Sequence, residues 1–294
     1  MTAAMLGPLR PQINRFKLGA FEITTILDGQ LVMPDFHPIF AHDQPESVAR
    51  AYAKKSLLPI REFVINFTPT LVNTGRELVL FDTGHGATKR QVGMGNLRDL
   101  LPAAGYSPED IDIIAFTHCH PDHISGVMEN DLQPLPNASY VIGQVEYDAW
   151  FKGDLIPSHR QPDRELFMKL IPPLAEKMSF LASGEDVVSG ITAIQAYGHS
   201  PGHMAYMIES HGESALLWGD ITNHYALSLQ MPEWKVGFDD DKDVAVATRK
   251  RILDMAATDR LVVIGHHMPF PSLGYVERWN GSYRWLPASY QMNV

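Results

Sequence analysis

The sequence predicts an α+β protein in which helices cover β-sheets. Short apolar runs typical of buried strands alternate with amphipathic segments typical of helices, and this alternation favours layered sheets and helices. Several predicted strands end directly in His or Asp residues, so both halves of the chain contribute candidate metal ligands. We expect a single domain over residues 1–294, because neither a repeat nor a low-complexity linker interrupts the chain.

Composition excludes several classes of protein. The 294 residues are 45% apolar, as in ordinary globular proteins, and the net charge of −10 offers no basic surface for nucleic acid or anionic membranes. The single cysteine excludes an intramolecular disulfide. No apolar run reaches the roughly 18 residues of a membrane span, and the first residues lack the pattern of a signal peptide. We therefore expect a cytoplasmic protein that binds neither nucleic acid nor membrane.

The N-terminal third predicts mostly strands, with one arm and one helix. Its elements are an arm over residues 1–15, a hairpin over 16–33, a helix over 44–56, and strands over 63–73 and 77–82. The arm is Pro-rich and aperiodic, which suits a segment that lies over the surface or on a partner subunit. Asp28-Gly29 is typical of a hairpin turn, and Asp43 with Glu46 has the spacing of a helix capping box.

The rest of the chain alternates strands and helices. We expect helices over 92–104, 124–128, 144–151, 163–178 and 243–257, and strands over 111–116, 139–143, 187–196, 204–209, 215–218 and 261–264. The acidic run at 239–243 predicts a solvated helix start. Asn280-Gly281 predicts a final hairpin, so residues 275–294 form a C-terminal hairpin and tail.

The densest ligand chemistry follows directly after a buried strand, in the segment HCHPDH that begins at His118. Side chains two apart on an extended segment share one side, so His118 and His120 can hold one metal ion. Pro121 bends the chain, so Asp122 and His123 can reach a second ion nearby. Divalent ions bind neutral imidazoles and carboxylates, and two ions about 4 Å apart share and activate a water.

Three later strand ends supply the further ligands that such a pair of ions needs. They carry His199, Asp220 and His267. A pair of ions also needs a carboxylate that bridges them. Cys119 points away from its two neighbours, so we expect a packed thiol there and not a ligand. The set as a whole indicates a two-metal hydrolytic site.

Four motifs resemble those of the metallo-β-lactamase superfamily. HCHPDH at 118–123 resembles its HxHxDH signature, and GHSPGH at 198–203 resembles the GHTPGH segment of its lactonase, glyoxalase II and organophosphate hydrolase branches. WGD at 218–220 resembles the strand end with the bridging aspartate. GHHMPFP at 265–271 is most similar to the methyl parathion hydrolase group, and the order of motifs fits over roughly residues 60–275. The resemblance implies the four-layer αββα sandwich of that superfamily.

The resemblance also implies a role for each ligand. Metal one is held by His118, His120 and His199, metal two by Asp122, His123 and His267, and Asp220 bridges the two. His266 remains an alternative to His267, although the alignment of HMPFP favours His267. Asp82 matches an aspartate that orients a ligand histidine, with the capping of its Gly-rich loop as the alternative, and His203 lies behind the ligands.

The same resemblance implies a mechanism, its cofactors and its substrates. The cofactors are two divalent ions, zinc first, with manganese, iron or cobalt as alternatives. A hydroxide shared by the ions attacks a carbonyl or phosphoryl centre, Asp220 holds the ions, and Asp122 passes the proton to the leaving group. The substrates are small, largely apolar lactones, esters or phosphotriesters.

Five residues near the motifs are candidates for the substrate pocket: Trp150, His224, Tyr225, Met268 and Phe270. Trp150 corresponds to a pocket tryptophan of the organophosphate hydrolases. His224 and Tyr225 closely follow Asp220 and can therefore reach a substrate. Core packing is the alternative for all five, because single large apolar side chains are more often core residues.

Four competing functions fit the residues less well. The carboxylate at 220 disfavours a β-lactamase, and the aromatic C-terminal hairpin disfavours a glyoxalase II-like thioester hydrolase. The acidic charge disfavours a nuclease, and His120 disfavours an iron redox protein, since the diiron reductases usually carry Glu there. Asn223 stands where the homoserine-lactonase branch usually carries a tyrosine, which weakens a lactonase of that kind. The arm and the aromatic tail lead us to expect a homodimer.

Overall fold

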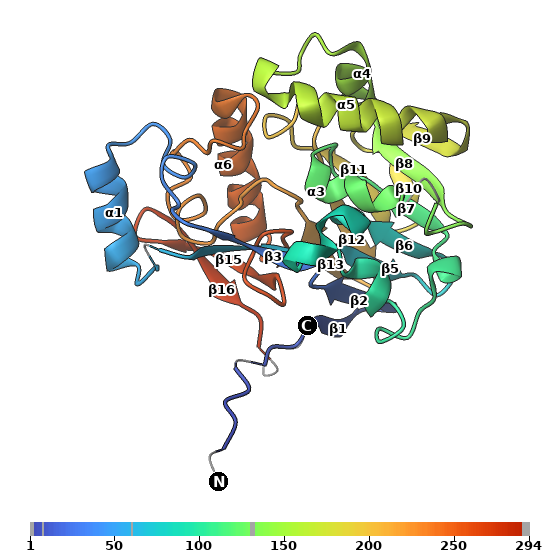
Figure 1. Ribbon diagram of the computed structural model, residues 1–294, viewed down its shortest axis with the longest axis horizontal. Helices are drawn as coiled ribbons and strands as arrows, with labels where there is room; N and C mark the ends of the chain where they lie inside the picture. The colour runs from blue at the N-terminus through green and yellow to red at the C-terminus, as the bar shows by residue number, and fades with distance from the viewer. Residues whose placement is uncertain (1–2, 8, 60, 130–132, 290–294) are drawn as a thin grey trace.

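Two seven-stranded sheets form the centre of the computed structural model, which describes residues 3–7, 9–59, 61–129 and 133–289 (Figure 1). The first sheet contains, in spatial order, β1 (Ile13–Leu18), β2 (Phe21–Ile26), β5 (Thr70–Asn73), β6 (Leu78–Phe81), β7 (Ile113–Ala115), β8 (Ser139–Gly143) and β9 (Met178–Leu181). The second contains β10 (Asp186–Val188), β11 (Ile191–Gln195), β12 (Met204–Ser210), β13 (Glu213–Leu217), β14 (Val262–Ile264), β15 (Leu273–Trp279) and β16 (Ser282–Pro287). A separate ribbon pairs β3 (Gly29–Met33) with β4 (Phe63–Phe67).

Helices lie on the outer faces of the sheets. The α-helices are α1 (Glu46–Lys55), α2 (Leu97–Leu100), α3 (Pro121–Ile124), α4 (Gln144–Lys152), α5 (Gln161–Leu170) and α6 (Lys242–Thr258). Short 3₁₀ helices are η1 (Gly86–Val92), η2 (Pro108–Asp110), η3 (Ser125–Val127), η4 (Ser158–Arg160) and η5 (Pro172–Lys177). Among the described residues, no helix has the length and apolar character that a membrane crossing requires.

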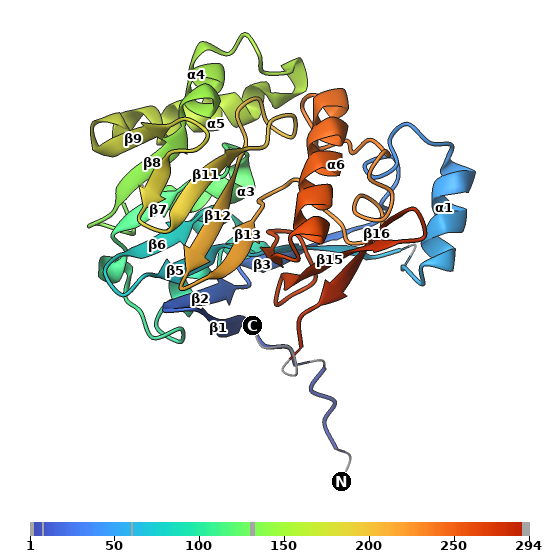
Figure 2. The same cartoon turned by 180° about the vertical axis from the view of Figure 1, so that it is seen from behind.

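Alternating side chains of the strands build the sandwich. In β6, Leu78 and Leu80 pack with the helices on the first sheet, whereas Val79 and Phe81 face the second sheet. In β13, Leu216 packs against α6 on the far side. Helices α4 and α5 thus cover one sheet and α6 covers the other (Figures 1 and 2). This arrangement confirms the four-layer αββα sandwich that the resemblance implied.

The hairpin predicted over residues 16–33 is wrong. β1 pairs with β2, but the next strand leaves the sheet and pairs with β4. Asp28 makes no hairpin turn because its fully buried carboxylate accepts hydrogen bonds from the backbone of His85, Gly95 and Leu97. The turn signal at this position therefore marks a link between distant loops.

The capping box predicted for the first helix is also absent. α1 begins at Glu46, after Pro45. The carboxylate of Asp43 instead accepts a hydrogen bond from the backbone of Lys235 at 2.9 Å, and Glu46 pairs with Arg50 at 2.7 Å. Tertiary contacts thus compete successfully with the local capping pattern.

The helix predicted over residues 163–178 is split into three elements. α5 ends at Leu170, because the following Pro172-Pro173 cannot continue an α-helix. A 3₁₀ turn follows, and residues 178–181 form β9 at the edge of the first sheet. The edge strand was not predicted.

The two ends of the chain behave differently. β15 and β16 pair around Asn280-Gly281, as predicted, while residues 290–294 of the expected tail lie outside the described residues. The first described residues of the arm extend away from the sheets (Figure 1). The predicted boundary at residue 15 is wrong, because β1 already begins at Ile13 and pairs with β2. The arm's apolar side chains Met5, Leu6 and Leu9 are 96%, 94% and 99% exposed.

Candidate metal centre

The predicted ligands gather where neighbouring strands end. Asp82 follows β6 and His118 follows the parallel strand β7, while Asp220 follows β13 and His267 follows the parallel strand β14. The turn between β11 and β12 brings in His199. Because parallel neighbours end at the same edge of a sheet, residues distant in sequence meet at one place.

The first group of candidate ligands consists of three imidazoles, His118, His120 and His199. All are buried, and one nitrogen of each lies within 4.8 Å of the others. His120 Nδ1 is 2.9 Å from His199 Nε2. His118 Nε2 is buried and has no hydrogen-bond partner. Three imidazole nitrogens that converge in this way suit a single divalent ion.

The second group combines a carboxylate with histidines. Asp122 Oδ2 lies 3.3 Å from His123 Nε2 and 3.5 Å from His267 Nε2. His266 belongs to the same cluster of atoms. The group thus offers the mixed carboxylate and imidazole donors of a second ion.

Asp220 lies between the two groups and contacts both. Its Oδ2 is 3.2 Å from His199 Nε2 and 2.8 Å from His267 Nε2, and its Oδ1 is 3.4 Å from His123 Nε2. The side chain is only 3% exposed. A buried carboxylate in this position fits a bridge between two ions.

The geometry favours His267 over His266 as the last ligand. His267 Nε2 faces the carboxylates of Asp122 and Asp220, and its Nδ1 lies 2.7 Å from the backbone oxygen of Asn66. The His266 ring packs on that of His123, with ring centroids 4.1 Å apart. His267 lines the cavity above the ligands, whereas His266 lines a much smaller one beside Asp82.

Each of the five candidate ligand imidazoles has a partner at its other nitrogen, as is usual for histidines that hold metals. The pairs are His118 Nδ1 with Thr117 Oγ1 at 3.0 Å, His120 Nε2 with Asp240 Oδ2 at 3.4 Å, His123 Nδ1 with Asp82 Oδ2 at 2.8 Å, His199 Nδ1 with Asp239 Oδ1 at 2.9 Å, and His267 Nδ1 with the Asn66 oxygen at 2.7 Å. These contacts set the orientation of each ring.

The resemblance implied an orienting role for Asp82, and its Oδ2 lies 2.8 Å from His123 Nδ1. Two further aspartates with the same kind of contact were not predicted. Asp239 and Asp240 belong to the acidic run that we interpreted as a solvated helix start. Asp241 has that role, since its carboxylate accepts from the first backbone amides of α6, and the exposed Asp243 lies in the first turn of the same helix. Asp239 is fully buried and Asp240 nearly so. The run of acids itself was the available signal, because buried partners of histidines are often carboxylates.

Burial and nearby charges act in opposite directions on the imidazoles. Burial lowers the pKa of His199, but Asp220 and Asp239 outweigh it and raise the pKa to about 9. At His120, burial and the Arg160 guanidinium outweigh Asp240 and lower the pKa to about 4. Without metal, His199 therefore carries a proton at neutral pH and His120 does not.

The carboxylates of the centre are ionised. Burial raises the pKa of Asp220, but His267, His123 and His199 outweigh it and hold the pKa well below the usual range. The same balance, with His123 as the main partner, lowers the pKa of Asp122. Protons on histidines thus balance the carboxylates, and bound cations would displace those protons.

Three buried polar atoms test whether metal ions fit. His118 Nε2, His123 Nε2 and Asp220 Oδ1 have no hydrogen-bond partner, and these residues converge to within 4.8 Å. An unsatisfied buried polar atom costs about 1–3 kcal/mol, so three in one cluster call for a ligand. Imidazole and carboxylate donors suit zinc, and also manganese, iron or cobalt. The residues fit two divalent ions.

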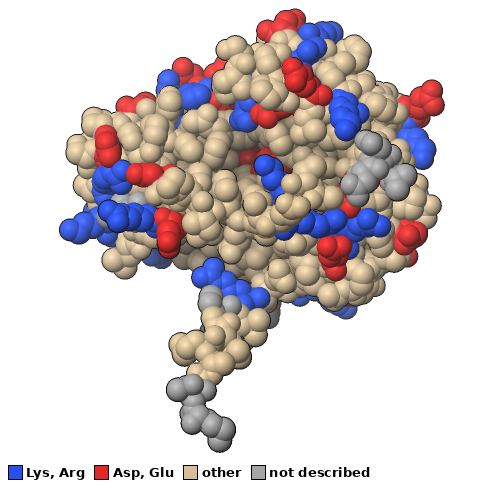
Figure 3. Space-filling view, viewed as in Figure 1, with Lys and Arg blue, Asp and Glu red and all other residues tan. Residues whose placement is uncertain are grey.

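A cavity of about 250 Å³ opens above the ligands. Its floor contains Asp122 and Asp220, and its walls are largely apolar, formed by Leu31, Ile65, Phe67 and Phe238, with Lys89 and Arg160 as cations. Figure 3 shows a central hollow with acidic atoms inside and a basic side chain at its rim, in agreement with this lining. A cavity of this size suits a small ligand.

The residues predicted for the substrate pocket do not line this cavity. Trp150 and Met268 are fully buried core residues, and the Trp150 indole donates to Glu146 Oε1 at 2.8 Å. His224, Tyr225 and Phe270 line a neighbouring cavity of about 380 Å³ behind His267. The core alternative therefore holds for Trp150 and Met268, because their surroundings leave no exposed face.

His203 and Cys119 support the centre from behind. His203 Nε2 accepts a hydrogen bond from the backbone amide of Asp220 at 3.0 Å. Cys119 is a buried free thiol in the core of the first sheet. Neither residue is among the atoms that converge on the two candidate ion positions.

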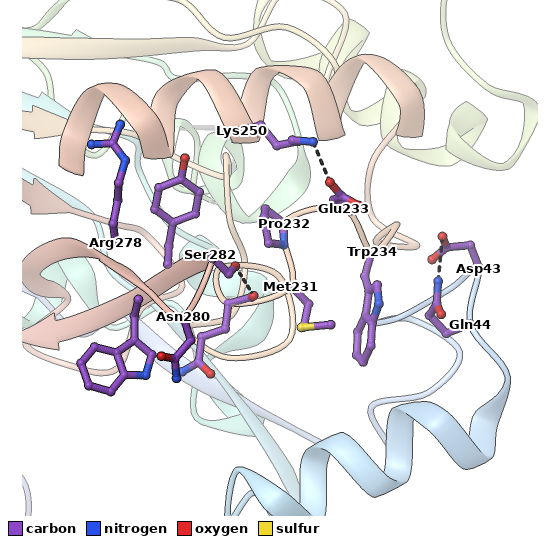
Figure 4. Close-up of a pocket in the computed structure, with 14 residues that line it drawn as sticks. Asp43, Gln44, Met231, Pro232, Glu233, Trp234, Lys250, Arg278, Asn280 and Ser282 are labelled. Atoms are coloured by element: carbon purple, nitrogen blue, oxygen red, sulfur yellow. Dashed lines mark hydrogen bonds and ion pairs between the residues drawn. The ribbon is translucent and has the colours of Figure 1, made fainter. Parts of the chain in front are cut away.

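A larger cavity lies elsewhere. It has a volume of about 900 Å³, and Figure 4 shows Trp234 and Met231 on its wall together with Lys250 and Glu233. None of the candidate ligands lines it, and Lys250 is paired with Glu233 at 2.7 Å. Cavity size alone would therefore have pointed away from the His/Asp centre.

Comparisons with known proteins point to one superfamily. The model of the "Metallo-beta-lactamase superfamily" matches residues 68–267, a range that contains all seven candidate ligands. An N-acyl homoserine lactonase of Bacillus cereus is 25% identical over 177 residues, which cover 57% of this chain and 60% of that protein. The chain thus spans about 60% of the length of the curated relatives it matches first.

Two solved structures are similar over nearly the whole chain. The hydrolase AbOPH in the beta lactamase superfamily has a TM-score of 0.88 and 28% identity, and the match covers 97% of this chain and 100% of that one. The dizinc quorum-quenching lactonase AidC, solved with the product N-hexnoyl-L-homoserine, has a TM-score of 0.85 and 27% identity, with 95% and 98% covered.

Proposed function

The chain belongs to the metallo-beta-lactamase superfamily, and we propose that it is a hydrolase with two divalent metal ions at the His/Asp centre. The position of Asp220 between the two ligand groups carries this proposal, with contacts of 3.2 Å to His199 on one side and 2.8 Å to His267 on the other. We assign His118, His120 and His199 to one ion, Asp122, His123 and His267 to the other, and Asp220 to both.

Two divalent ions at this centre would supply an activated water near neutral pH and would polarise the bond to be cleaved. The protein's own contribution is to hold charge and to move a proton. Asp122 is the carboxylate suited to the second task, because its side chain is 18% exposed and lines the cavity, against 3% for Asp220. Its ionised Oδ2 can accept a proton and release it to a leaving group.

Small lactones with an apolar substituent are the substrate class that we propose first. The largely apolar cavity walls support an uncharged acyl group, since Leu31, Ile65 and Phe67 present no charge to it. The similarity to AidC, which was solved with an acyl-homoserine product, supports the same class.

Simple esters and phosphotriesters are the second candidate, and Asn223 favours them. This residue stands where the homoserine-lactonase branch usually carries a tyrosine. Its Nδ2 donates to Asp220 Oδ2 at 3.0 Å and the side chain is buried. It therefore offers no phenol to contact a lactone carbonyl.

Metal analysis joined to a substrate panel tests the proposal. We expect two ions per chain, and turnover of γ- and δ-lactones that is lost with a chelator and restored by zinc. The panel also contains p-nitrophenyl esters, paraoxon, nitrocefin and a glutathione thioester. Asp220→Asn should lose metal and activity together, whereas the exposed Asp259→Asn should keep both. Activity on nitrocefin or the thioester alone, or full activity in metal-free protein, would contradict the proposal.

A further inference from the structure

Two consecutive aspartates lie behind the first ligand group. Asp239 Oδ1 is 2.9 Å from His199 Nδ1, and Asp240 Oδ2 is 3.4 Å from His120 Nε2. Their side chains are 0% and 3% exposed. A buried carboxylate is costly unless a cation or several hydrogen bonds compensate it, so the partners of these two residues matter.

Each aspartate has its own arginine, but the two arginines differ. Arg249 of α6 donates to Asp239 at 2.8 Å and is itself fully buried. Arg160, at the end of η4, donates through Nε to Asp240 at 3.0 Å and is 14% exposed. Arg160 also donates to the backbone oxygen of Phe238 at 2.6 Å, which secures the loop that carries the two aspartates.

The Arg160 side of this arrangement reaches the cavity. Arg160 and His120 both line the cavity above the ligands. Arg160 comes from the connection between α4 and α5, whereas Asp240 precedes α6, so the pair joins segments from the two outer helix layers. A continuous set of contacts therefore leads from the cavity wall through Asp240 to a ligand ring.

The contacts also determine which nitrogen of His120 is free. An ionised carboxylate only accepts hydrogen bonds, so Asp240 requires a proton on His120 Nε2. Nδ1 is then the atom with the lone pair, and it is the atom that faces His199 Nε2 at 2.9 Å. The 3.4 Å contact is long for a hydrogen bond, so its orienting effect depends on Arg160 to keep Asp240 in place.

We propose that Arg160 and Asp240 form a positioning pair that holds the His120 ring with Nδ1 directed at the first ion. The inference rests on the proposed function, because it assumes that the centre binds metal. Neither residue is a catalytic residue in this proposal, since both act through His120. Loss of a partner behind a ligand histidine typically costs 10- to 100-fold in metal affinity.

Zinc titration of the metal-free full-length chain, in competition with a chromophoric chelator, tests the pair. We expect Asp240→Asn and Arg160→Met each to weaken the binding of one of the two zinc ions by 10- to 100-fold. The affinity for the other ion should not change. The double variant should lose no more zinc affinity than the single variant with the larger loss, because both residues act through one ring. Asp240→Glu should restore part of the affinity.

Asp163→Asn is the matched control. Asp163 contacts the same guanidinium at 3.0 Å, through Nη1, and among the described residues it forms no hydrogen bond or ion pair with His120. We expect this variant to bind both ions like the wild type. The visible spectrum of the cobalt-loaded protein is a second readout, and it should change in Asp240→Asn and not in Asp163→Asn.

The outcomes separate this inference from the proposed function. Wild-type protein that binds no zinc would overturn both. Two ions bound with unchanged affinity in Asp240→Asn and Arg160→Met would overturn only the positioning pair. If Asp240→Asn does not fold, Arg160→Met carries the test, because Arg160 is more exposed than Asp240 (14% against 3%) and Asp240 keeps its contact with His120 Nε2 in that variant.

Discussion

Replacement of Glu146 tests how the two loops of the first ligand group are held together. This residue of α4 is fully buried. Its carboxylate accepts hydrogen bonds from the backbone of Cys119 at 2.8 Å and of Gly202 at 2.7 Å, and from Trp150 Nε1 at 2.8 Å and Ser200 Oγ at 2.5 Å. One side chain thus connects the HCHPDH loop to the HSPGH turn.

The expected loss of stability follows from these four donors. Glu146→Ala leaves them without this acceptor, at about 1–3 kcal/mol for each unsatisfied buried donor. Burial raises the pKa of Glu146 despite its hydrogen bonds, so removal of the carboxylate recovers part of that cost. We therefore expect a net loss of about 3–5 kcal/mol, a large share of the 5–15 kcal/mol typical of folded proteins.

Glu146→Gln gives a graded version of the same test. One amide oxygen can still accept from Cys119 and Trp150, but the amide nitrogen meets the Gly202 donor. We expect a loss of about 1–3 kcal/mol, from one unsatisfied pair. The exposed Glu165→Gln on α5 is the control and should change stability by no more than about 0.5 kcal/mol.

Urea unfolding of the metal-free protein measures the free energy of unfolding, and zinc content measures the effect on the centre. Glu146→Ala should lose both stability and the first ion, because the loops that carry His118, His120 and His199 are no longer joined. A variant that unfolds within about 1 kcal/mol of the wild type and still binds two ions would refute the reasoning.

Three further predictions concern the ligands, the pH dependence and the arm. His267→Ala should lose one ion per chain by metal analysis, whereas His266→Ala should keep both; the reverse result would exchange their roles. Because carboxylates raise the pKa of His199 from about 6.5 to about 9, the stability it contributes to the metal-free protein is fully present below pH 6.5 and is lost as the pH rises through 9. Zinc uptake in that range should release protons in a pH-stat, and uptake without release would contradict the assignment. A chain without residues 1–9 should be monomeric by light scattering if the exposed arm supports the expected homodimer, and a wild-type monomer would refute that expectation.

Local motifs were predicted well because covalent geometry determines them. HCHPDH places four donors on six consecutive residues, so the spacing alone limits how far apart their atoms can lie. The αββα class followed from the motifs, and the alternating strands confirm it. The end of α5 is also a local effect, because Pro172 in the sequence prevents the helix from continuing.

Features that depend on distant partners were not predicted. Asp28-Gly29 has the composition of a turn, but the carboxylate of Asp28 is buried by loops around 85 and 95–97. Trp150 has the character of a pocket aromatic, but its indole is held in the core by Glu146. The cavity walls at Leu31 and Phe67 come from the β3–β4 ribbon, whose paired residues lie at least 30 positions apart in the sequence.

By itself, the sequence determined the superfamily, the layered fold and the list of candidate ligands, because these depend on residue types at short, fixed spacings. Only the tertiary structure decided which nitrogen of each imidazole faces the centre and, apart from Asp82, which residues hold it there. Asp239 and Asp240 show the reason: their acidic run resembles a solvated surface until Arg249 and Arg160, from other parts of the chain, are brought against them. The energy of a buried charge depends on partners that meet only in three dimensions.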